Sequence, residues 1–381
     1  MDQATEVPEA NVATETPPAP APRARRSGPQ RAVGAVWWLF RFALALFLFI
    51  GALQVMKEGA AGLSVLSHDG LAKNAGATLG LGWIGALFVL SGSPIAASAL
   101  TLVKADTITE NEGFTMLTGS RLGAAFVVLL VAVVAALRSS EGKRMAPLST
   151  AVMALSTTAL IYIPGAFLGF LLLQWGPFHA LDLQFPAQFG DLIDIVYGDL
   201  LALVENWAAP LLFLGGLALL LVSFKLIDSV APELDDHAIE SSRLSWLRRK
   251  WPMFGLGCLV ALVSMSVSVA LTVLVPLVSK GYAKREDIVP YIMGANITTL
   301  GDTMLAAFLL HSAAAVRIVL AEVIGTAVIS VLLLAFFYPQ VRRGIWKFQR
   351  QMVKSKPRLA IFTAALFVVP LAIVGISVAV A

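Results

Sequence analysis

The chain has few charged residues and almost no cysteine. Only 14% of its 381 residues are charged, whereas soluble domains contain about one-quarter. The single cysteine, Cys258, excludes an intramolecular disulfide, and cysteine–histidine clusters that would hold a metal are absent. The sequence also lacks an HExxH pattern, a glycine-rich phosphate loop with lysine, and a nucleophile–base constellation. An enzyme is therefore not expected, and the net charge of +4 does not indicate a nucleic-acid partner.

Long apolar runs take the place of these features. Hydrophobic residues make up 58% of the chain, and the mean hydropathy is +0.81. Several runs reach the roughly 20 residues that cross the hydrocarbon core of a bilayer. The sequence predicts an all-α polytopic membrane protein, integral to the cell membrane. Full crossings are expected at 33–55, 113–138, 146–175, 207–230, 287–311, 313–338 and 358–380.

Two more apolar segments are interrupted by polar residues. Segment 78–105 is broken by Ser91-Gly92-Ser93-Pro94, and segment 251–280 by a serine run from Ser264 to Ser268 and by Pro276. A proline just after a serine cap starts a new helix, and each apolar half is too short to span. We therefore predict two re-entrant hairpins whose tips are buried in protein or line a cavity.

Loop charges predict the orientation. Residues 1–31 form a proline-rich tail with a basic end, which we expect to be disordered and cytoplasmic. The loops at 138–144 and 341–357 are basic and so also cytoplasmic, whereas 176–206 is acidic and extracytoplasmic. This alternation holds only if each interrupted segment enters and leaves on one side, which supports the two hairpins. A last helix is expected at 358–381.

An internal repeat links the two halves at an offset of 175 residues. Matching positions share a small, hydroxyl or acidic side chain: Gly119 and Gly294, Ser91 and Ser266, Ser93 and Ser268, Glu112 and Asp287. The first unit, 32–175, makes three full crossings. Because this number is odd, the second unit, 207–340, would have the opposite orientation in the membrane. Inverted-topology repeats with interrupted helices are an architecture of secondary transporters.

The stretch Gly294-Ala295-Asn296-Ile297-Thr298-Thr299, about thirty residues after a serine-rich hairpin, resembles the sodium/phosphate cotransporter family (the type II class and its bacterial relatives) over roughly residues 33–340. That family carries a Gln-Ser-Ser-Ser-like hairpin and a Gly-Ala/Ser-Asn-Ile-Gly-Thr-Thr-like helix start in each repeat. This chain has no glutamine in either hairpin, and Arg121 stands where the family has asparagine. The resemblance implies sodium-coupled transport of inorganic phosphate by alternating access around a midplane site.

Phosphate needs hydrogen-bond donors and positive potential, which helix N-termini supply. The candidate substrate residues are therefore the hairpin serines and one arginine: Ser91, Ser93, Arg121, Ser266 and Ser268. An arginine fork suits a pair of phosphate oxygens, and snorkelling to the interface is the alternative for Arg121. Oxygen ligands for sodium would come from Asn296, Thr298, Thr299 and Asp302.

Three further expectations concern acids and partners. Asp302 is a natural partner for Arg121 across the pseudo-twofold axis, and Glu322 is expected to pair with Arg317 or lie at the interface. Expected partners are phosphate, sodium, the bilayer and, as an option, a second copy of the chain. Two other functions stay open: transport of another small anion or proton coupling through Asp302, and a transport-inactive membrane scaffold or regulatory subunit.

Overall fold

The structure is a computed structural model of the chain. It describes residues 28–63, 70–138, 145–175, 178, 187–204, 206–230, 249–264, 270, 278 and 287–380. Every element of regular structure in these residues is a helix. Residues 41–380 within this set belong to one compact unit, which contains all of the elements discussed below except the start of α1 (Gly28–Ala60).

The prediction of a polytopic helical membrane protein is confirmed at the level of its crossings. Seven helical segments of the described chain are long and apolar enough to span a bilayer: Val36–Ala60, Glu110–Arg138, Met145–Trp175, Ala209–Ser229, Val289–Leu309, Ala313–Phe336 and Lys356–Val380. They coincide with the seven predicted crossings. The helices α1, α6 (Met145–Trp175), α8 (Ala209–Val230), α14 (Ala313–Phe336) and α16 (Lys356–Val380) carry five of them.

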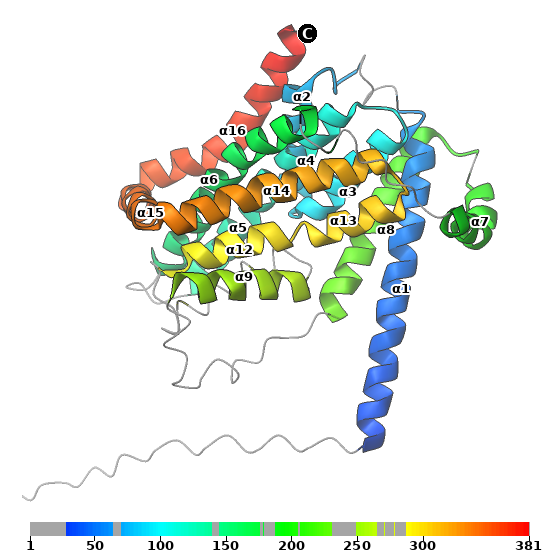
Figure 1. Cartoon of the computed structure of the whole chain (residues 1–381), viewed down its shortest axis with the longest axis horizontal. Helices are drawn as coiled ribbons and strands as arrows, with labels where there is room; N and C mark the ends of the chain where they lie inside the picture. Colours follow the sequence, from blue (N-terminus) through cyan, green and yellow to red (C-terminus); the bar gives the residue numbers. More distant parts are fainter. Residues whose placement is uncertain are drawn as a thin grey trace, which may run out of the picture. The chain divides into compact units, whose positions relative to one another are not determined.

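The other two crossings are interrupted, which the sequence reading did not anticipate. The first consists of α4 (Glu110–Ala124) and α5 (Phe126–Arg138), and the second of α12 (Val289–Thr298) and α13 (Gly301–Leu309). Figure 1 shows α12 and α13 following one another along nearly the same line. At the second interruption Leu300 N donates to Ile297 O at 3.3 Å, a tight turn in place of the regular ladder. Both interruptions lie beside polar residues of the candidate site.

Segments expected as tail or loop are partly helical. The acidic segment 176–206 contains α7 (Ala187–Ala202), and the basic segment 341–357 is mostly α15 (Tyr338–Val353). The helix α1 already begins at Gly28, within the expected tail. The rest of that tail and Ser266, Ser268 and Pro276 lie outside the described residues.

The first interrupted apolar segment forms two short helices, α2 (Ala75–Val89) and α3 (Gly92–Lys104). Leu90 ends α2 in the left-handed conformation, with φ 57°, and Ser91 begins α3. Both helices pack on α4: the start of α3 lies against Ser120 and its end against Gly113. Helix α3 is therefore antiparallel to α4. Helix α2 contacts α3 where Gly85 meets Ile95.

One packing arrangement occurs twice, at the offset of 175 residues found in the sequence. A Cβ added at Gly119 of α4 would lie 2.0 Å from the Leu79 carbonyl oxygen of α2. A Cβ added at Gly294 of α12 would lie 2.1 Å from the Phe254 carbonyl oxygen of α9 (Lys250–Ser264), the position 175 residues after Leu79. Glycine is required at both positions because the backbones touch. The pairs α2–α4 and α9–α12 are therefore equivalent.

Local sequence explains where the site helices begin. Thr109 and Glu112 form a reciprocal capping box that starts α4, with Thr109 N donating to Glu112 Oε2 at 2.8 Å. Ser312 caps α14 by accepting from Ala315 N at 3.2 Å. Helix α14 then crosses α6 so closely that a Cβ on Gly325 would lie 2.2 Å from the Gly165 carbonyl oxygen. These contacts bring α4, α6 and α14 together around one polar cluster.

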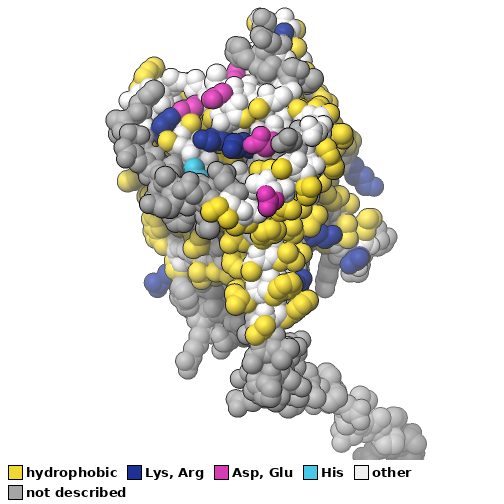
Figure 2. Space-filling view, turned by 90° about the vertical axis from the view of Figure 1, so that its right-hand side faces the viewer, with side chains coloured by type: hydrophobic (Ala, Val, Ile, Leu, Met, Phe, Trp, Pro, Cys, Tyr) yellow, Lys and Arg dark blue, Asp and Glu magenta, His cyan; other side chains and the backbone are white. Residues whose placement is uncertain are grey.

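The surface suits a bilayer. Large apolar side chains project outward from several spans, including Phe167, Leu211 and Leu371, each more than half exposed. Figure 2 shows hydrophobic side chains over much of one face, with acidic side chains in its upper part and lysine and arginine side chains both there and at the edges. Such a broad apolar exterior is not stable in water, and hydrocarbon is the solvent that accommodates it.

Candidate functional site

A buried ion pair joins the two interrupted crossings. Arg121 Nη2 of α4 lies 3.6 Å from Asp302 Oδ1 of α13, and the two side chains are 1% and 3% exposed. The sequence-based expectation that these two residues pair is confirmed. Arg121 does not snorkel to an interface, since it is among the largest fully enclosed side chains of the described protein. A charge so deep in an apolar protein is retained only with a partner.

Thr303 links the two charges. Its hydroxyl donates to Asp302 Oδ1 at 2.8 Å and accepts a hydrogen bond from Arg121 Nη2. The helix ends favour the same arrangement: Arg121 lies in the last turn of α4 and Asp302 in the first turn of α13. A cation stabilises the negative end of a helix and an anion the positive end. The interruption after Thr298 thus supplies the helix start on which Asp302 is placed.

Glu322 is a second buried carboxylate at this site, and the sequence reading missed its role. It lies on α14 with no exposed surface, and Thr118 of α4 donates to its Oε2 at 3.0 Å. Arg121 also interacts with it electrostatically. The expected pairing with Arg317 is wrong, because Arg317 forms an ion pair with Glu110. The sequence could have excluded this pair, because a spacing of five residues places Glu322 and Arg317 on different faces of α14.

Helix α6 closes the cluster with hydroxyl groups. Tyr162, fully buried, donates to the Asn296 carbonyl oxygen at 2.7 Å. Thr158 accepts from Asn296 Nδ2 at 3.0 Å. Thr299 also donates to the Asn296 carbonyl oxygen, at 3.2 Å. Tyr162 interacts electrostatically with Arg121, so the Asn296 group and the arginine group form one cluster.

The predicted sodium ligands do not all face this cluster. Asn296, Thr299 and Asp302 are buried around it. Thr298 instead points to α9 and donates to the Cys258 carbonyl oxygen at 2.8 Å. One position of difference along a helix turns the side chain by about 100°, which separates Thr298 from its neighbour Thr299. Thr298 is therefore a helix-packing residue in this structure.

The hairpin serines are only partly placed. Ser91 caps the start of α3 without a side-chain hydrogen bond to that helix, and Ser93 is buried at 6% exposure. Gly92, between them, lies against Ser120, the neighbour of Arg121. Ser91 and Ser93 thus lie where the start of α3 packs against α4. Ser266 and Ser268 lie outside the described residues.

Several polar atoms of the cluster have no hydrogen-bond partner among the described residues. They are Arg121 Nε and Nη1, Asp302 Oδ2 and Glu322 Oε1. Two N–H groups can bind an oxyanion, and two carboxylate oxygens can bind a cation or a proton. With both acids ionised, one arginine and two carboxylates carry a formal charge of −1. The cluster therefore has donors for an anion and an excess of negative charge that favours a cation.

Comparisons with protein-family models, with curated proteins and with solved structures find no match.

Proposed function

We propose that the chain is a secondary active transporter that carries a small oxyanion together with a cation. The observation that carries this proposal is the buried cluster, in which two nitrogens of Arg121 and one oxygen each of Asp302 and Glu322 have no hydrogen-bond partner among the described residues. Unpaired buried polar atoms are costly in a membrane unless they act on a ligand. Anion donors and cation acceptors within one cluster suit coupled binding.

The repeated packing of α2–α4 and α9–α12 supports the transporter architecture. We interpret these units as inverted-topology repeats, with α2 and α3 as a re-entrant hairpin and α9 as the first arm of another. The interrupted crossings α4–α5 and α12–α13 then meet at the centre, where Arg121 comes from one repeat and Asp302 from the other. Midplane sites at the interface of such repeats are typical of secondary transporters.

We assign inorganic phosphate as the substrate and sodium as the coupling ion, on the resemblance of Gly294 to Thr299 to the sodium/phosphate cotransporters. The charge of the cluster supports an order of binding. When Asp302 and Glu322 are both ionised, the formal charge of −1 attracts a cation first, and the bound cation reduces the repulsion toward phosphate. The N-terminus of α3 packs against α4 at Ser120, next in sequence to Arg121, and we expect its dipole to add positive potential there.

Proton coupling is the second candidate, and Glu322 is the observation that favours it. Its two oxygens meet only the Thr118 hydroxyl among the described residues. Asp302 already has Arg121 as a cationic partner, so Glu322 is the acid left to take a proton.

We infer the orientation of the protein in the membrane from the basic segment 341–357, which we place in the cytoplasm together with the N-terminus.

Ligand-dependent thermal stability tests this proposal on the purified full chain. A ligand that binds only the folded state raises the melting temperature by mass action. We expect phosphate to stabilise the protein more in sodium than in potassium buffer, and sulfate or chloride to stabilise it less. Arg121→Lys, which keeps the charge but loses the fork, should reduce the phosphate shift. No shift with phosphate under either cation would contradict the proposal.

A further inference from the structure

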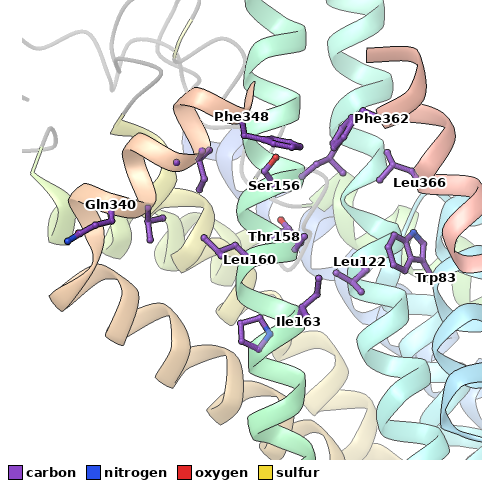
Figure 3. A pocket seen from close by; sticks show the side chains of 16 residues that line it. Trp83, Leu122, Ser156, Thr158, Leu160, Ile163, Gln340, Phe348, Phe362 and Leu366 are labelled. Carbon is purple, nitrogen blue, oxygen red and sulfur yellow. The ribbon is translucent and has the colours of Figure 1, made fainter. Parts of the chain in front are cut away.

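A large apolar groove lies beside the candidate site, between α6, which also contributes to that site, and two helices that do not, α15 and α16. Its volume is about 710 Å³, and its walls come mainly from α6, α15 and α16. Figure 3 shows Leu160 and Ile163 of α6, Phe348 of α15, and Phe362 and Leu366 of α16 around it. Pockets of several hundred Å³ hold organic ligands. Since α6 and α16 are membrane crossings, the groove is reached from the hydrocarbon region.

Helix α15 presents two different faces beside this groove. Gln340, Val341, Gly344, Ile345 and Phe348 line the groove and share one side of the helix. Gly344 faces open space, because an added Cβ there would have no atom within 4 Å. Ile345 and Gln349 are buried and hold the helix in place, with Ser149 of α6 donating to Gln349 Oε1. The wall of the groove that α15 forms is therefore held in place by contacts with the rest of the protein.

The adjoining face of α15 is cationic. It carries four exposed side chains spaced at i, i+4, i+7 and i+11, which fall on one stripe of the helix: Arg343, Lys347, Arg350 and Lys354. No acidic residue occurs between 338 and 358 in the sequence. Arg342 is separate from this stripe and pairs with Asp287 at 3.8 Å. Lys347 lies at the edge of the stripe next to Gly344, so cationic groups border the mouth of the apolar groove.

We propose that this groove binds an anionic phospholipid, with an acyl chain between α6, α15 and α16 and the headgroup phosphate at Arg343 and Lys347. An apolar cavity among crossings next to exposed cations matches the two ends of such a lipid. Basic pockets between membrane helices bind anionic headgroups, and basic amphipathic helices lie in the interface. Thr158 of α6 lines this groove and also accepts from Asn296, so the groove borders the proposed transport cluster. The lipid proposal does not depend on phosphate being the transported substrate.

Lipid binding to the purified, delipidated full chain tests this site, with phosphatidylglycerol and phosphatidylcholine as probes. Native mass spectrometry should show preferential retention of phosphatidylglycerol. Each cation near an anionic lipid contributes about fivefold in affinity, so Arg343→Gln/Lys347→Gln should weaken phosphatidylglycerol binding by roughly 30-fold. The matched control Arg41→Gln/Lys225→Gln removes two cations from α1 and α8 and should leave binding unchanged.

A second variant tests the apolar part. Gly344→Phe places its Cβ in open space on a residue that lines the groove. We expect the ring to occupy the groove and to reduce the retention of phosphatidylglycerol at least tenfold while the melting temperature without lipid is preserved. Equal retention of the two lipids by the unmodified protein would overturn the proposal. So would equal effects of the two double variants, or displacement of phosphatidylglycerol by inorganic phosphate alone, which would mean that the acyl chain is not bound. The comparison of phosphatidylglycerol with phosphatidylcholine on the unmodified protein needs no variant, so it tests the proposal even where a substitution impairs folding.

Discussion

At the residue scale, the candidate site depends on one arginine that is buried within membrane-spanning helices. Arg121 forms an ion pair with Asp302, donates a hydrogen bond to Thr303 and interacts electrostatically with Glu322. The desolvation of such a group is offset only by well-placed partners. The sequence indicated Arg121 and Asp302 because charges are rare in apolar runs. It did not indicate Thr303 or Tyr162, because hydroxyl and phenol groups are common in membrane helices and usually bond to their own backbone.

The coupling between Arg121 and Asp302 is measurable by a double-mutant cycle. Arg121→Met should destabilise the protein by about 3–5 kcal/mol, because it leaves a buried carboxylate without its cation. Arg121→Met/Asp302→Leu should recover much of this loss, since neither charge then remains. Unfolding in detergent measures each free energy. Strictly additive effects of the two substitutions would mean that the pair does not interact in the native state.

Glu322→Gln separates the two coupling ions. The amide oxygen can still accept from Thr118, so the hydrogen bond of 3.0 Å is kept while the charge and the titration are lost. A hydrogen bond to a charged group is worth about 1.5–3 kcal/mol. A loss of similar size for the contact between the carboxylate and sodium would raise the sodium concentration for half-maximal uptake tenfold or more. Uptake driven by an imposed pH gradient should be unaffected. Loss of a pH-driven response with unchanged sodium dependence would favour proton coupling instead.

At the element scale, the two interrupted crossings and their glycine contacts define the centre of the protein. The equivalence of α2–α4 and α9–α12 follows from identical offsets in both sequence and packing. The sequence predicted the positions of the crossings, because a span requires a long apolar run. It could not predict the breaks after Ala124 and Thr298, because neither contains proline and the surrounding helices satisfy the freed backbone groups.

The close glycine contacts are testable by single substitutions. Gly119→Ala and Gly294→Ala place a Cβ about 2 Å from a backbone oxygen, so each should destabilise the protein by about 1–3 kcal/mol. Gly255→Ala, on α9 with open space around it, is the matched control and should be neutral or slightly stabilising. Thermal unfolding in detergent compares the three. If all three behave alike, the repeated backbone contact is not a determinant of the fold.

The basic segment near the C-terminal crossing shows another limit of sequence reading. Its cations were interpreted as a cytoplasmic loop, because charge asymmetry is the strongest topological signal. The same residues form α15, and the spacing of Arg343, Lys347, Arg350 and Lys354 is that of a helix face. Ile345 and Gln349, which anchor the helix, are buried. Charge predicts the side of the membrane, but apolar contacts decide whether the segment is ordered.

At the scale of the whole molecule, the described residues contain seven candidate membrane spans, a repeated packing unit and a buried polar cluster, and these form one consistent arrangement. The crossings and the pairing of Arg121 with Asp302 were available from the sequence. The inclusion of Glu322 and Tyr162 was not, because it depends on how α6 and α14 cross at Gly165 and Gly325. Long-range helix contacts of this kind have no local signature in the chain.

Uptake of radiolabelled phosphate into proteoliposomes containing the full chain tests the central proposal most directly. An inward sodium gradient should drive accumulation above that of empty liposomes, and Arg121→Lys should lower it at least tenfold, because the fork geometry is lost. Lys225→Gln, an exposed cation on α8, should leave uptake unchanged. Absence of phosphate accumulation under both sodium and proton gradients, with protein that is folded and correctly inserted, would contradict the assignment of this chain as a phosphate transporter.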